Sequence, residues 1–100
     1  MRRFTTPTLI LEIDKPELID VDTFYVTIKQ GDPALTITVT DRESTETGVR
    51  LSVDLSQLQT AGFSVGKASV QVNWMDGNVR GATQIAVISI TDNLLNQVID

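Results

Sequence analysis

The chain has 100 residues, of which 41% are hydrophobic and 21% are charged, and its net charge is −5. This is the composition of one ordinary globular domain, and it excludes a disordered tail or a coiled coil. Cysteine and histidine are absent, which excludes disulfides, thiol nucleophiles, Ser-His triads and ordinary zinc sites. Because an acidic surface repels phosphate backbones, we also expect no sequence-independent binding of nucleic acid.

Hydrophobic residues alternate with polar ones along most of the chain, which is the pattern of half-buried strands. Turn residues separate the alternating stretches, and residues 41–48 are polar throughout and predict a loop. The predicted strands are Thr8 to Asp14, Thr23 to Gln30, Leu35 to Thr40, Val49 to Leu55, Ala68 to Met75, and Val79 to Thr91.

Short motifs predict how the strands are connected. Gly31-Asp32-Pro33-Ala34 predicts a hairpin between the second and third strands. Asp76-Gly77-Asn78 is the strongest hairpin signal, and Gly77 should have a positive φ there. Between the fourth and fifth strands, Ser56 to Gly62 matches a capping box around one helical turn. A single turn of helix would suit a connection that crosses from one sheet to another.

These elements predict an all-β protein, an immunoglobulin-like antiparallel β-sandwich of six or seven strands. A small β-barrel is the alternative. We expect one domain over residues 1–100, with 1–7 as an arm and 92–100 as a short tail. Trp74 is in phase with Val70 and Val72, so it should be buried in the core.

The sixth predicted strand is apolar on both faces near its end. Ala86, Ile88 and Ile90 lie on one side, and Ile85 and Val87 lie on the other. One face of each strand of a two-layer sandwich meets water, so this second apolar face needs a cover. The arm, the tail segment 94–98 or another subunit could provide it. Ile85 and Val87 are therefore the candidate protein interface.

Other residue patterns are weaker candidates for catalytic, metal or ligand sites. Four carboxylates lie at and just after the end of the first strand, at Asp14, Glu17, Asp20 and Asp22. Their spacing does not match the ligand positions of an EF-hand, so it indicates a solvated acidic loop. Nothing frames Lys67 and Ser69 as a nucleophilic pair. We expect no enzyme, no metal and no cofactor. Tyr25 is predicted to point outward between Thr23 and Thr27, and is the candidate exposed aromatic contact.

Four segments resemble known proteins: 1–8, with Met1-Arg2-Arg3-Phe4; 53–60, with Val53-Asp54-Leu55-Ser56; 65–74, ending at Trp74; and 87–95. They resemble small proteins encoded in prophages of Gram-positive gut bacteria. The same order of turns and strands is similar to the N-terminal domain of phage baseplate upper proteins, an immunoglobulin-like sandwich with a structural role. The resemblance covers most of the chain and implies a virion or assembly component that works through protein contacts.

The functional hypothesis is therefore a non-catalytic phage or prophage structural or assembly protein. Its partners would be other phage structural proteins or a second copy of the chain. The alternative is a carbohydrate-binding module for host-surface glycans. No apolar run is long enough for membrane insertion, and polar residues follow Arg2 and Arg3 where a signal peptide would be apolar. We expect synthesis in the bacterial cytoplasm, with the virion as a second location.

Overall fold

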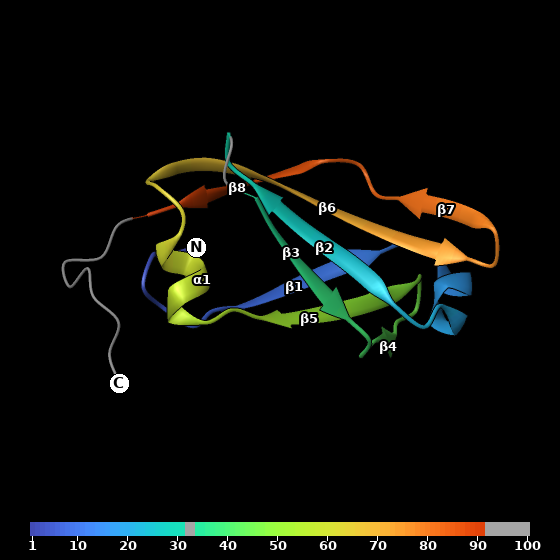
Figure 1. Cartoon of the computed structure of the whole chain (residues 1–100). Coiled ribbons are helices and arrows are strands. Elements are labelled where there is room, and N and C mark those ends of the chain that lie inside the picture. The colour runs from blue at the N-terminus through green and yellow to red at the C-terminus, as the bar shows by residue number, and fades with distance from the viewer. Residues whose placement is uncertain (32–33, 92–100) are drawn as a thin grey trace.

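The computed structural model describes residues 1–31 and 34–91, and it folds them as two β-sheets packed face to face (Figure 1). Two short helical segments, η1 (Pro16–Asp20) and α1 (Gln57–Ala61), connect strands at opposite ends of the sandwich. The strands are β1 (Thr8–Ile13), β2 (Phe24–Lys29), β3 (Ala34–Val39), β4 (Glu43–Ser44), β5 (Val49–Asp54), β6 (Gly66–Asp76), β7 (Val79–Ala82) and β8 (Ala86–Ile90).

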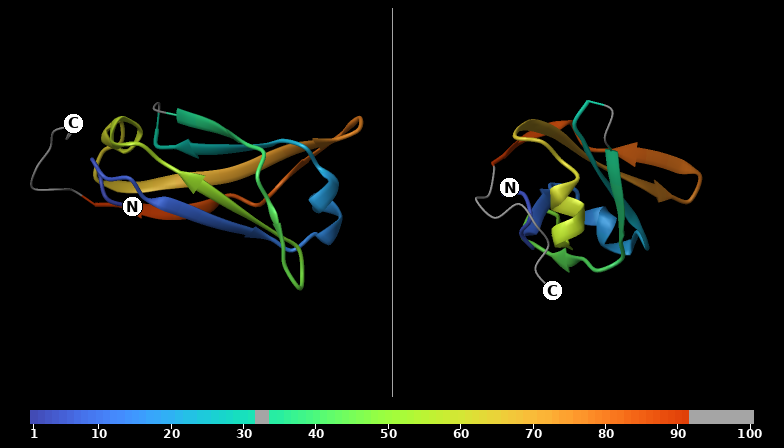
Figure 2. Two further views of the ribbon diagram at one scale, coloured as in Figure 1. Left: turned by 90° about the horizontal axis from the view of Figure 1, so that it is seen from below. Right: turned by 60° about the vertical axis from the view of Figure 1, so that its left-hand side comes forward.

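The strand order is that of an immunoglobulin-like sandwich. One sheet has the order β1-β5-β4, and the other has the order β3-β2-β6-β7, with β8 also paired to β6. The named strand pairs are all antiparallel. In immunoglobulin terms, the first sheet holds strands B, E and D, and the second holds strands C′, C, F and G. The predicted sandwich is confirmed, and the barrel alternative is not adopted, because the two sheets are separate (Figure 2).

The core forms where the alternating faces of the two sheets meet. Phe24, Val26 and Ile28 of β2 are fully buried, as the alternation predicts. Trp74 of β6 is 6% exposed and lies beside Phe24, with ring centroids 6.4 Å apart and the rings tilted by 59°. The prediction that Trp74 is a core residue is therefore confirmed.

The predicted connections are also confirmed. The Ser56 hydroxyl accepts a hydrogen bond from the Gln59 N–H at 3.1 Å, and Gln59 Oε1 accepts one from the Ser56 N–H at 2.8 Å. This capping box begins α1, which takes the chain from β5 to the other sheet. Gly77 has a φ of 62°, and β2 pairs with β3 as a hairpin. The turn residues 32–33 lie outside the described residues.

The predicted arm, residues 1–7, lies against the body of the domain. The Thr5 N–H donates to Thr60 Oγ1 at 3.1 Å, and this hydroxyl donates in turn to Thr5 O at 2.9 Å. Thr60 is fully buried. The Arg3 N–H donates to Thr91 O at 2.9 Å. The arm therefore begins beside the end of β8 and continues to α1. The predicted tail, residues 92–100, lies outside the described residues.

The loop prediction for residues 41–48 is wrong in one part, because β4 pairs with β5 within it. Arg50 of β5 explains the pairing. Its guanidinium lies 2.9 Å from the Glu12 carboxylate of β1 and 3.7 Å from the Glu43 carboxylate of β4. The central arginine thus bridges the carboxylates of both neighbouring strands.

The prediction of one strand from Val79 to Thr91 is also wrong. β7 and β8 both pair with β6, but the register shifts by one residue between them. Asn73 pairs with Ala82, whereas Val70, three residues before Asn73, pairs with Ala86, four residues after Ala82. Two residues of β6 therefore face three, residues 83–85, which is a β-bulge. Thr83 maintains the ladder across the bulge: its N–H donates to Val72 O at 2.9 Å, and its hydroxyl accepts from the Val72 N–H at 3.0 Å.

Candidate functional site

The outer face of the five-stranded sheet is the side that points away from the other sheet, and it is the candidate site. Directly paired residues share a face, so the strand register assigns its side chains. Three rows cross it, which are Thr38–Tyr25–Asn73–Ala82, Thr36–Thr27–Gln71, and Ala34–Lys29–Ser69–Val87. Short polar residues make up most of this surface.

The bulge decides which apolar residues join the outer face. A one-residue shift moves the following side chains to the opposite face. Ala82 of β7 and Val87 of β8 consequently lie on the same face, although they are an odd number of positions, five, apart in the sequence. Ile85 lies beside Thr27 and Gln71, where it lines a hollow of about 150 Å³.

Ile85 and Val87 are the exposed apolar pair of this face. Their side chains are 64% and 62% exposed, while Ile90 of the same strand is 2% exposed. The arm was one predicted cover, but it contacts the end of β8 near Thr91 instead. The other predicted cover, the tail segment 94–98, lies outside the described residues. Within the described part of the chain the second apolar face therefore meets solvent.

Tyr25 points outward, as predicted, and is 42% exposed. It borders a hollow of about 380 Å³ that Thr27, Thr36, Asn73 and Arg80 also line. The Thr27 and Thr36 hydroxyls lie 3.0 Å apart, and Arg80 Nη2 donates to Asn73 Oδ1 at 3.2 Å. The two hydroxyls thus hold each other in place, and the Arg80 guanidinium holds the Asn73 amide.

Basic and acidic side chains lie at opposite ends of the five-stranded sheet. Lys29 and Lys67 lie at the end near α1. At the η1 end, Asp20, Asp22 and Asp76 line a second hollow of about 290 Å³, next to Tyr25. Sequence reasoning missed this arrangement, because only the register of β2 and β6 shows that residues so far apart in the chain share an end of the sheet.

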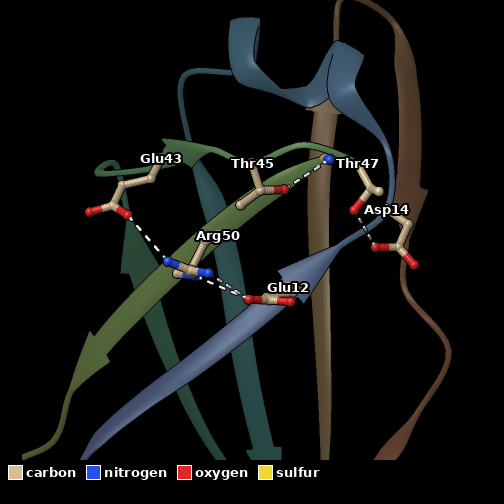
Figure 3. Close-up of polar contacts among 7 residues, drawn as sticks. Glu12, Asp14, Glu43, Thr45, Thr47 and Arg50 are labelled. Carbon is tan, nitrogen blue, oxygen red and sulfur yellow. Dashed lines mark hydrogen bonds and ion pairs between the residues drawn. The ribbon is translucent and has the colours of Figure 1, made fainter.

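The other sheet carries a surface network of polar contacts with a structural role (Figure 3). Besides the Arg50 ion pairs, Thr47 Oγ1 donates to Asp14 Oδ1 at 3.4 Å, and the Gly48 N–H donates to Thr45 Oγ1 at 3.0 Å. These bonds fix the turn that leads into β5. Among residues 1–31 and 34–91, no group of three or more acidic side chains is arranged to hold a metal ion.

The remaining sequence candidates do not form a site. Lys67 and Ser69 share the outer face of β6, and no hydrogen bond joins their side chains. In the described part of the chain, both helical segments are only five residues long, and neither has the length or the apolar character to cross a bilayer. Comparison of the chain with protein-family models, curated proteins and solved structures finds no match.

Proposed function

We propose that this protein is a non-catalytic interaction module that docks onto another protein through the outer face of its five-stranded sheet. In line with the resemblance stated above, we assign it to the structural or assembly proteins of a phage or prophage, made in the bacterial cytoplasm. The observation that carries the proposal is the exposure of Ile85, just before β8, and Val87 of β8, on a segment whose Ile90 is buried in the core.

The physical argument is the cost of apolar surface in water. Full burial of one Ile or Val side chain contributes ~1.5–3 kcal/mol. Ile85 and Val87 are more than half exposed, and Ile85 shares a hollow with Thr27 and Gln71. An apolar patch rimmed by polar residues is typical of a protein contact surface.

Site-specific photo-crosslinking in the cells that encode the protein tests this proposal. A photoreactive phenylalanine analogue replaces Ile85 or Val87, and the matched control carries it at Ile10, which is 61% exposed on the other sheet. We expect protein adducts from positions 85 and 87 that the control position does not give. Equal adducts from all three positions, or none at 85 and 87, would contradict the proposal.

Carbohydrate binding is the second candidate, and Tyr25 is the observation that favours it. An exposed aromatic ring beside fixed hydroxyl and amide groups can stack on a sugar ring while the polar groups bind its hydroxyls. If this is the function, Tyr25→Ala abolishes binding on a glycan array, while Ile85→Lys with Val87→Lys leaves it. An array with no signal for the wild type removes this candidate.

A further inference from the structure

Strand β3 is an edge strand that lacks the features by which proteins protect their sheet edges. We infer that its free edge pairs with β3 of a second copy of this chain, antiparallel and about a two-fold axis normal to the sheet, so that the two five-stranded sheets become one continuous sheet. This inference goes beyond the proposed function and does not depend on it, because it concerns the edge of the sheet and not the docking of its outer face.

The edge of β3 has the length and composition of a strand that can accept a further strand. β3 is the last strand of its sheet, and all six of its residues pair with β2 on the other side, without a bulge. Ala34–Val39 contains no proline and no charged residue. The unpaired N–H and C=O groups of such an edge are a template for another chain, and natural edge strands are usually very short, charged, bulged or covered. β3 has none of these protections.

The other strand edges each carry at least one of them. β4 is two residues long, and β1 carries Glu12, which is ion-paired with Arg50. β7 carries Arg80 and is followed by the bulge. The end of β8 is paired with the arm, because the Thr91 N–H donates to Met1 O at 2.8 Å. The contrast singles out β3 within residues 1–31 and 34–91.

β3 itself has the alternation that its free edge requires. A strand that pairs there must place apolar side chains inward and short polar ones outward, as β2 does on the other side. Val26 of β2 lies opposite Ile37, and Thr27 lies opposite Thr36, with their hydroxyls 3.0 Å apart. Cross-strand pairs of this kind stabilise a sheet. A second copy of β3 repeats the pattern of β2 and brings no charge to the junction.

The alternation also limits the register. Directly opposed residues share a face, so the axis must pass through a pair of identical residues and not between two pairs. An axis at Ile37 places Thr36 opposite Thr38 of the second copy, and Leu35 opposite Val39. An axis at Thr36 would draw a proline of the preceding turn into the pairing, and proline has no N–H for a ladder. An axis beyond Ile37 pairs fewer residues. We therefore assign the axis to Ile37.

A hollow beside β3 lies where the inward side chains of the second copy would enter. β4 pairs only with Val49 and Arg50 of β5, so the rest of β5 has no strand beside it on that side. A hollow of about 240 Å³ lies there between β3 and β5, and Ile37 and Val53 are among the residues that line it. Ile37 is only half-buried in the single chain. In the dimer, the second copy's Ile37 packs against it beside this hollow.

The junction is small and uncharged. Residues 35–39 of each strand span about 17 Å at ~3.4 Å per residue, so the buried area is well below the ~800 Å² that each partner buries in a standard interface. We therefore expect a dimer that dissociates in the micromolar to millimolar range and that salt does not weaken. β8 lies on the other side of the sheet from β3, so the dimer leaves Ile85 and Val87 of both copies accessible.

Charges on the two outward threonines test the pairing, because each charge would lie opposite a like charge of the second copy. The first variant is Thr36→Lys with Thr38→Lys, and the second is Thr36→Glu with Thr38→Glu; both positions are exposed. Sedimentation equilibrium should show a dimer for the wild type and at least about tenfold weaker dimerisation for each variant alone. An equimolar mixture of the two variants should recover a dimer that contains one copy of each.

The matched control places the same charges on an edge of the other sheet. Thr8→Lys with Ile10→Lys changes two exposed residues of β1 that are also two positions apart, and it should leave dimerisation unchanged. Circular dichroism confirms that each variant is folded before its association is measured. If this control weakened the dimer as much as the lysine variant of β3 does, the role of β3 would be refuted.

Single cysteines test the register, because the chain has no cysteine of its own. Under mild oxidation, Thr36→Cys mixed with Thr38→Cys should give a disulfide-linked dimer, since these positions are directly opposed. Either variant alone should give much less, because like positions lie two residues out of register. Equal yields from the mixture and from the single variants would overturn the assigned axis.

The outcomes separate this inference from the proposed function. A wild type that stays monomeric to millimolar concentration overturns the second copy as the partner of β3, and so does a dimer that neither charged variant weakens. Photo-crosslinks from positions 85 and 87 to a different protein would still support the outer face as a docking surface in both cases. Conversely, a dimer that behaves as expected stands even if those positions give no adduct.

Discussion

Gly81 lies directly opposite Trp74 in the β6–β7 ladder, and the indole ring occupies the space that a Cβ at this position would need. The glycine thus allows the tryptophan side chain to pack closely against the neighbouring strand. Burial of Trp74 could be predicted from its phase with Val70 and Val72. The requirement for glycine could not, because it depends on which residue of the next strand faces the ring.

We predict that Gly81→Ala lowers the free energy of unfolding by ~1–3 kcal/mol, because the methyl group forces the indole from its position. Gly62→Ala is the matched control, since the nearest atom to its Cβ would be Gln59 O at an ordinary 3.4 Å. Urea titrations of both variants give the comparison. If Gly81→Ala were as stable as Gly62→Ala, the close packing of the indole against β7 would be refuted.

Thr60 is the buried polar residue that holds the arm, through the two hydrogen bonds to Thr5. Thr60→Val keeps the shape of the side chain but leaves the backbone N–H and C=O of Thr5 unpaired. We expect a loss of ~1–3 kcal/mol of stability and faster hydrogen exchange of the Thr5 amide. Thr60→Ser restores the hydroxyl and should restore protection of that amide. Unchanged exchange in Thr60→Val would mean that the arm is held in another way.

At the scale of elements, the bulge between β7 and β8 is the feature that the sequence did not reveal. Residues 79–91 contain apolar side chains throughout and no strong turn signal, so their pattern predicts one strand. A bulge is a property of a strand pair, and it appears only when β6 supplies the register. The strands with clear alternation, such as β2 and β5, have the predicted residues buried.

Thr83 compensates for the bulge, because its hydroxyl accepts the hydrogen bond from the Val72 N–H that a backbone carbonyl accepts in a regular ladder. Thr83→Val should destabilise the domain by ~1–3 kcal/mol, because it leaves this backbone donor unpaired next to the core. Thr36→Val removes an exposed hydroxyl whose partner is the half-buried side chain of Thr27, and it should cost far less. Thermal unfolding of both variants is the measurement. Equal losses would contradict the role given to Thr83.

At the scale of the whole molecule, alternation and turn chemistry were sufficient to predict the sandwich, since each strand buries one face against the other sheet. The candidate site could be predicted only in part. Tyr25, Ile85 and Val87 could be found from the alternation, because each is an aromatic or apolar residue at an outward position where the pattern otherwise places polar residues. The basic and acidic ends of the five-stranded sheet could not, because each end joins residues from separate segments of the chain.

The central claim is that the outer face of the five-stranded sheet docks onto protein. Site-specific photo-crosslinking in the cells that encode the protein, with the photoreactive residue placed singly at four exposed positions, tests it most directly. We predict protein adducts from positions 85 and 87, and none from positions 10 and 58, which replace Ile10 of the other sheet and Leu58 of α1 and are also exposed. Equal adducts from all four positions, or none from 85 and 87, would contradict the claim.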